Sequence, residues 1–153
     1  MNDFIDNKLY QKIHNYLPIV CVDIVIKVPD NRFIMVKRKE NPAKDKWWFV
    51  GGRVFKNESL ESAAQRKVQE EIGLTIKIDN KIIEGYELFF KEDPYDHGNG
   101  THVIVGCFLS EIKNIENLKL DKFHYEYKLF KHFDNNWHHY LKECLEQAGF
   151  SKE

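Results

Sequence analysis

Hydrophobic residues recur at helical spacing in three stretches of the chain. Residues Asp3 to Tyr16 and Asn136 to Ala148 both place apolar side chains three or four positions apart, and Gly149 is the predicted C-cap of the second stretch. A third helix is predicted at Glu58 to Ile72, with Asn57 as its N-cap. Helices are therefore expected at both ends of the chain and near its middle.

Runs of β-branched and aromatic residues predict the strands. Ile19 to Val28 and the following run FIMVKRK flank the turn segment VPDNR, which predicts a hairpin. Further strands are predicted at Trp47 to Val50, at Ile82 to Lys91 and at Thr101 to Ser110. Strands with helices between and around them predict an α+β fold, an α/β/α sandwich with a mixed β-sheet.

Composition restricts the class of protein. The chain has 153 residues, of which 42% are hydrophobic and 14% aromatic, so it can bury a core and is not disordered. The 23 basic and 24 acidic residues give a net charge of −1, which provides no overall attraction for nucleic acid. We find neither an apolar run of about 18 residues nor a secretory signal, so no membrane contact and a cytoplasmic location are expected. No linker divides residues 1–153, which predicts one domain.

The central predicted helix follows a glycine pair and concentrates charge on one face. Lys67, Glu70 and Glu71 stand at positions i, i+3 and i+4, and Arg66 is spaced to pair with Glu70. Two adjacent carboxylates on a rigid helix can hold a hard cation such as Mg²⁺, although such a face on an arbitrary helix is usually only solvated. The spacing around these residues decides between the two interpretations.

Residues 52–74 resemble the Nudix box, Gly-x5-Glu-x7-Arg-Glu-U-x-Glu-Glu-x-Gly-U, where U is apolar. The matching positions are Gly52, Glu58, Arg66, Val68, Glu70, Glu71, Gly73 and Leu74. The resemblance implies a Nudix hydrolase that uses Mg²⁺, or Mn²⁺, held by Glu70, Glu71 and the carbonyl of Gly51. Lys67 stands where the family has a glutamate, so we expect fewer protein-bound cations and a general base from elsewhere in the chain.

The likeness extends beyond the helix, to the branch of GDP-mannose mannosyl hydrolases, whose box lacks the same glutamate. The shared features between Pro18 and about Phe130 are the strand with Asp23, the strand end Lys37-Arg38, the segments Asn41-Pro42-Ala43 and Gly51-Gly52-Arg53-Val54, the strand start Thr101-His102, and a late loop with His124. Phe123 departs from this pattern, because the branch has a metal-binding glutamine there.

This second resemblance implies a reaction and a role for each residue. Water would attack carbon 1 of the sugar, with His124 as the catalytic base, and GDP would leave. Three arginines would lie along the diphosphate and favour its departure: Arg38, Arg53 and Arg66. Asp23 would bind the substrate by accepting hydrogen bonds. The residues alone leave another role for Asp23 open, because a carboxylate inside a strand also needs a structural partner.

The expected substrate is a nucleotide sugar, GDP-mannose or GDP-glucose, which would give GDP and the free sugar, and the resemblance implies a homodimer. The alternative is a pyrophosphohydrolase that cleaves the phosphoanhydride of an NDP-X or NTP substrate, which the retained Glu70 and Glu71 favour. A third hypothesis, a catalytically inactive module that binds a nucleotide, rests on Lys67 and Phe123. One of five aromatic residues is expected to face the nucleobase: Trp47, Trp48, Tyr86, Phe89 or Phe90.

Overall fold

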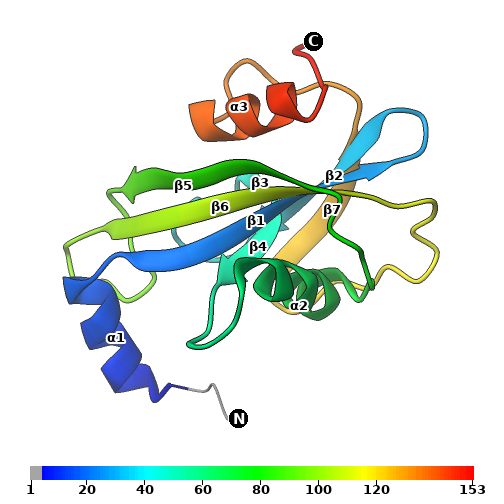
Figure 1. The fold of residues 1–153 in the computed structure, drawn as a ribbon. Helices are drawn as coiled ribbons and strands as arrows, with labels where there is room; N and C mark the ends of the chain where they lie inside the picture. Colours follow the sequence, from blue (N-terminus) through cyan, green and yellow to red (C-terminus); the bar gives the residue numbers. More distant parts are fainter. Residues whose placement is uncertain (1–4) are drawn as a thin grey trace.

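A mixed sheet of seven strands forms the centre of the computed structural model, which describes residues 5–153 (Figure 1). The strands are β1 (Ile19–Val28), β2 (Arg32–Arg38), β3 (Trp47–Trp48), β4 (Val50–Arg53), β5 (Asn80–Phe90), β6 (Thr101–Glu111) and β7 (His124–Phe130). The helices are α1 (Asn7–Tyr16), α2 (Leu60–Ile72) and α3 (His139–Gln147). Within residues 5–153, none of the helices has the length and apolar character needed to cross a membrane.

Strand β1 is the strand on which the topology depends. It runs parallel to β6 from Ile19 to Lys27, while its antiparallel partner changes from β4 at Cys21–Ile24 to β2 at Lys27 and Val28. The change is possible because the chain crosses from one strand to the other after β3. Trp48 pairs with β2, whereas Val50, two residues later, pairs with β1. The glycine pair that follows is thereby placed beside the first half of β1.

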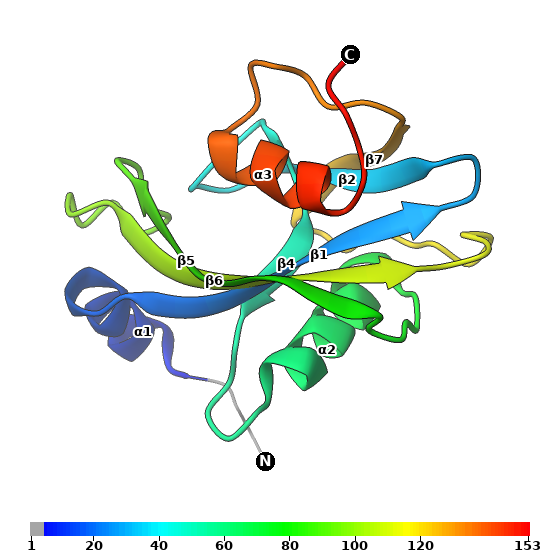
Figure 2. The same cartoon turned by 45° about the horizontal axis from the view of Figure 1, so that its top comes forward.

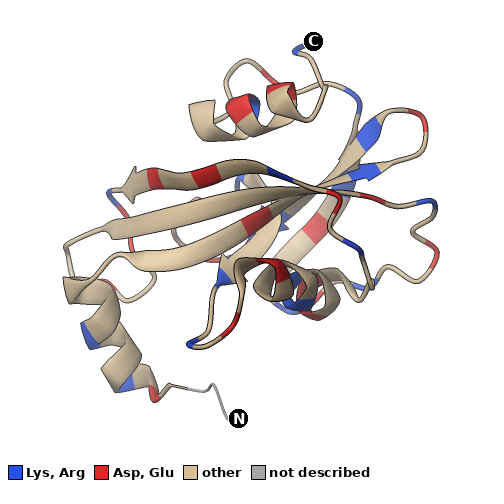
Figure 3. Ribbon diagram, in the orientation of Figure 1, with Lys and Arg blue, Asp and Glu red and all other residues tan. Residues whose placement is uncertain are grey.

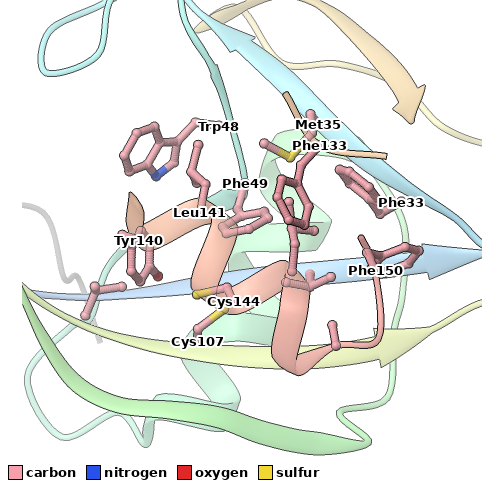
Figure 4. Close-up of a cluster of buried hydrophobic side chains, with 14 of the residues drawn as sticks. Phe33, Met35, Trp48, Phe49, Cys107, Phe133, Tyr140, Leu141, Cys144 and Phe150 are labelled. Carbon is pink, nitrogen blue, oxygen red and sulfur yellow. The ribbon is translucent and has the colours of Figure 1, made fainter. Parts of the chain in front are cut away.

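Alternating side chains of β1 build two cores, one on each face of the sheet. Val22, Ile24 and Ile26 pack in one buried cluster with α2, below the sheet in Figures 1 and 2. Val25 belongs to the other cluster, which includes Tyr140 of α3. Figure 4 shows this second core, in which Cys107 of β6 and Cys144 of α3 belong to the same cluster as several aromatic rings. The α/β/α sandwich with a mixed sheet, predicted from the sequence, is confirmed.

The start of α2 differs from the prediction. The helix begins at Leu60, and Ser59 is its N-cap, with its hydroxyl accepting the amide of the third helical residue at 3.1 Å. Asn57 lies in the preceding turn with φ 66°, and the carboxylate of Glu58 accepts the amide of Phe55 at 3.0 Å. The predicted cap at Asn57 is therefore wrong, because Glu58 is held in the loop by its side chain. The predicted end at Ile72 is confirmed.

The terminal helices are shorter than predicted. Helix α1 begins at Asn7 with Asp6 as its N-cap, and the predicted start at Asp3 lies outside the described residues. Helix α3 begins only after His138, whose ring nitrogen accepts the amide of Tyr140 at 3.1 Å. Its C-cap is Ala148 and not the predicted Gly149.

Strand β7 was not predicted from the sequence, and its first residue, His124, was expected in a loop. Its segment HYEYKLF is mostly exposed and carries few buried apolar residues, so the hydrophobic pattern did not identify it. It pairs antiparallel with β2, from Phe33 with Phe130 to Arg38 with His124. His124 is therefore the first residue of a strand, beside Arg38, and not a loop residue.

The position of the α2 cap can be tested by unfolding. Ser59→Ala removes the hydroxyl that accepts the helix amide and should lower the free energy of unfolding in urea by about 1 kcal/mol. Ser59→Gly is the comparison: glycine is tolerated at an N-cap, so this variant should lose only a few tenths of a kcal/mol. Equal losses in the two variants would contradict the assignment of Ser59.

Candidate active site

A cavity of about 1270 Å³ opens where the first half of β1 meets β4, the side of α2 and helix α1. Its lining combines groups of both charges with aromatic rings, as a site for a charged ligand with a ring system would require. Six of the eight predicted site residues line it: Asp23, Arg38, Gly51, Arg53, Glu71 and His124. Arg66 and Glu70 lie beside the cavity without lining it.

Asp23 lies on the face of β1 that looks toward α3, and it is buried. Its Oδ2 accepts hydrogen bonds from the Tyr140 hydroxyl at 2.9 Å and from Trp48 Nε1 at 3.3 Å. Burial raises the pKa of Asp23 to about 7, although these two hydrogen bonds and the charge of Arg38 act in the opposite direction. The structure thus provides the structural partners that the sequence left open.

Gly51 faces Asp23 across the β1–β4 pair. A Cβ at this position would overlap the Asp23 carboxylate and the backbone carbonyl of Val22. The amide of Gly51 donates to Glu71 Oε2 at 3.3 Å. Only glycine allows β4 to lie this close to Asp23 and to the backbone of β1, which explains a requirement for glycine immediately before the box.

Arg66 connects the β4–α2 loop to the helix. Its guanidinium donates to both oxygens of Glu58, at 2.7 and 3.0 Å, and to both oxygens of Glu70, each at 3.1 Å. It also donates to the carbonyl of Arg53 at 2.8 Å and stacks on Phe55 with 3.7 Å to the ring centroid. Hydrogen bonding from Arg66 lowers the pKa of Glu58. The structure therefore gives Arg66 protein partners at Nε and at both Nη groups.

Lys67 extends from the next position of α2 toward the cavity. Its ammonium lies 3.2 Å from Glu70 Oε2 and 3.2 Å from Glu71 Oε1. Burial alone would lower the pKa of Lys67, but the two carboxylates outweigh it and raise the pKa, so the side chain is an ammonium. Burial raises the pKa of Glu71, and the Lys67 charge opposes that shift. Figure 3 shows both signs of charge on α2.

The predicted ligands Gly51, Glu70 and Glu71 do not fit a divalent cation in this arrangement. Glu70 is paired with two cationic side chains, and Glu71 is held by Lys67 and by the Gly51 amide. Mg²⁺ requires about six oxygen ligands in a regular octahedron. In the described part of the chain, residues 5–153, no three His, Cys, Asp or Glu side chains are grouped to hold a metal ion. An ammonium lies where the two carboxylates meet.

His124 is held by a carboxylate that the sequence analysis missed. Its Nδ1 lies 2.8 Å from Asp121 Oδ1, and its Nε2 lies 3.8 Å from Glu71 Oε2. The backbone amide of Asp121 in turn donates to the carbonyl of Glu71 at 2.9 Å. Because the Asp121 carboxylate accepts a hydrogen bond from Nδ1–H, the Nε2 atom of a neutral ring is left as a proton acceptor. A carboxylate three residues before the histidine was the available signal.

The remaining arginines and helix α1 complete the cavity wall. Arg38 is oriented by a hydrogen bond from its Nε to the carbonyl of Pro42 at 2.7 Å. The guanidinium of Arg53 lies over the ring of Tyr10, 5.0 Å from its centroid, so that α1 shapes the site. Of the five aromatic candidates for the nucleobase, Trp48 and Phe90 line the cavity. The sequence analysis gave α1 no part in the site.

Comparison with known proteins identifies one family. The family model described as NUDIX domain matches residues 17–146. The low-salt glycan biosynthesis protein Agl8 of Haloferax volcanii is 28% identical over 130 residues, which are 85% of this chain and 81% of that protein. An ADP-ribose pyrophosphatase of Methanocaldococcus jannaschii is 33% identical over 114 residues, 74% of this chain and 66% of that protein.

A solved structure agrees with the fold. The crystal structure of a MutT protein from Methanosarcina mazei superposes with a TM-score of 0.60 at 27% identity, covering 72% of this chain and 75% of that one. The region matched by the family model, residues 17–146, includes all seven described strands and α2, whereas α1, which also lines the cavity, precedes it.

The raised pKa of Asp23 predicts a dependence of stability on pH. The folded state favours the neutral carboxyl of Asp23. The contribution of this group to the free energy of unfolding is therefore complete below about pH 4 and is lost as the pH rises to about 7. Over this range the free energy of unfolding of the wild type should fall relative to Asp23→Asn, by up to about 1.4 kcal/mol per pH unit. Urea unfolding of both proteins from pH 4 to 8 measures the difference. Parallel curves would show that Asp23 titrates as an ordinary carboxylate.

Proposed function

The chain belongs to the NUDIX domain family, and on this premise we propose that it hydrolyses a nucleoside diphosphate sugar. GDP-mannose or GDP-glucose is the expected substrate, with GDP and the free sugar as products. The family acts on small nucleotide substrates and generally uses Mg²⁺ or Mn²⁺. The reaction proposed for this chain is attack of water on carbon 1 of the sugar. A homodimer, expected from the resemblance, is part of the proposal.

The pairing of His124 with Asp121 carries this proposal. His124 lines a cavity that also holds two arginines, Arg38 and Arg53, and its Nε2 is the ring nitrogen that Asp121 does not contact. Such a histidine can take a proton from water, while the guanidinium groups stabilise the charge that develops on a diphosphate leaving group. The substitution of Lys67 for the box glutamate removes the carboxylate that would otherwise be a candidate base, which favours His124.

The proposed reaction is a single displacement at carbon 1 of the sugar. The oxygen of water forms a bond to carbon 1 and gives one proton to His124 Nε2. The bond between carbon 1 and the diphosphate oxygen breaks, and its electron pair leaves with the diphosphate. Asp121 holds the imidazole in place and stabilises the imidazolium that results. Asp23, which lines the cavity, would contact the sugar or the base.

The relatives support two candidate reactions. The relative in Haloferax volcanii is a glycan biosynthesis protein, and glycans are assembled from activated sugars, which supports a nucleotide-sugar substrate. The relative in Methanocaldococcus jannaschii is an ADP-ribose pyrophosphatase, which favours the second candidate, cleavage of a phosphoanhydride. The retained Glu70 and Glu71 also favour the second candidate. The two reactions break different bonds and can be separated by isotope labelling.

Hydrolysis in ¹⁸O-labelled water tests which bond breaks. A panel of nucleotide sugars is first assayed with Mg²⁺ and Mn²⁺ to find a substrate, and the products are then analysed by mass spectrometry. We expect the label in the free sugar and none in the nucleotide, because water attacks carbon. Label in a phosphate group would establish phosphoanhydride cleavage and reject the leading proposal.

Replacement of the base tests the role of His124. His124→Gln keeps a polar side chain that cannot take up the proton, and kcat should fall by at least about 100-fold with a much smaller change in KM. His132→Gln, on the exposed surface, is the matched control and should leave both constants unchanged. An unchanged kcat in a folded His124→Gln protein would remove the base from the mechanism.

A further inference from the structure

The ammonium of Lys67 occupies a position that is unusual for a helix-surface lysine. It lies at the same 3.2 Å from a carboxylate oxygen of Glu70 and one of Glu71, and it lines the cavity. An ordinary i,i+4 ion pair is solvated at both ends and contributes little. Here only 18% of the Lys67 side chain and 8% of the Glu71 side chain are exposed. The lysine is therefore part of the cavity wall.

The neighbouring backbone leaves room for this side chain. A Cβ on residue 52 would lie 2.5 Å from Lys67 Cε and 3.1 Å from its ammonium, so the lysine packs directly against the glycine of the box in this arrangement. The ammonium pairs with the buried carboxylate of Glu71, whose other polar neighbours are the Gly51 amide and His124 Nε2. Any divalent cation bound by Glu70 and Glu71 would first have to displace it.

We propose that the Lys67 ammonium is the resident cation of this site, in place of a divalent ion held by the protein. It neutralises Glu71, and its remaining hydrogen-bonding capacity is available to a diphosphate in the cavity. The first part of the proposal stands on the geometry of Lys67, Glu70 and Glu71. The second part, contact with a diphosphate, rests on the proposed function. The wild-type protein should therefore bind nucleoside diphosphate without any divalent ion.

Direct titration with Mn²⁺, followed by the paramagnetic resonance of the free ion, tests the first part. The wild type should show no site tighter than about 1 mM, whereas Lys67→Glu, which restores the oxygen ligand of the family pattern, should bind at least about tenfold more tightly. Lys67→Met removes the charge without adding a ligand and should show a smaller gain. Lys81→Met, which removes an exposed ammonium paired with Glu84, is the control and should match the wild type.

Two results would contradict the assignment of Lys67 as the resident cation. One is a micromolar Mn²⁺ site in the wild type. The other is the absence of any gain in Lys67→Met and in Lys67→Glu, with circular dichroism showing that the variants are folded. Should Lys67→Glu fail to fold, the gain expected of Lys67→Met decides the matter alone.

Calorimetric titration with GDP in excess EDTA tests the second part. The wild type and Lys81→Met should bind GDP, and Lys67→Met should bind it at least about tenfold more weakly. Equal affinities in the wild type and Lys67→Met would overturn the contact with the diphosphate. The Mn²⁺ titrations can give the expected outcome while the wild type binds neither GDP nor ADP, in EDTA or in Mg²⁺. In that case Lys67 is the resident cation, but the proposed substrate class is wrong.

Discussion

The pairing of β1 with β4 is the constraint on which the site depends. It sets Asp23 opposite Gly51, and from these two residues contacts run to both helical layers. The Gly51 amide holds Glu71 of α2, while Asp23 accepts the hydroxyl of Tyr140 in α3. Since a side chain at residue 51 would overlap the Asp23 carboxylate, the two layers meet the sheet at this point only because the strand carries a glycine.

The electrostatics of the cavity follow from this close approach. Burial raises the pKa of Asp23 and of Glu71, which would leave both carboxyls reluctant to ionise. The two carboxyls have different partners: neutral hydrogen-bond donors surround Asp23, whereas the Lys67 ammonium lies beside Glu71. A net charge of −1 over the whole chain therefore conceals a cavity in which positive and negative groups alternate over a few ångströms.

Much of the site could be predicted from the sequence because its central part is local. The residues of α2 are related by helical spacing, so the pairing of Arg66 with Glu70 and the proximity of Lys67 to both glutamates followed from their positions. The pairing of Asp121 with His124 was missed, and β7 was not predicted because its polar pattern gives no sign of a buried face. The contribution of α1 was also missed, since Tyr10 and Arg53 are far apart in the sequence.

The sequence by itself determined the mixed sheet, the three helices to within a few residues, and the family through the spacing of residues 52–74. Periodicity and short spacings are enough for these features, because they depend on neighbours along the chain. Only the tertiary structure decided what the predicted site residues contact. Arg66 holds the loop before α2, Asp23 is bonded to α3, and Lys67 takes the position between the two glutamates. These outcomes depend on burial and on strand pairing between distant segments, which the order of residues does not reveal.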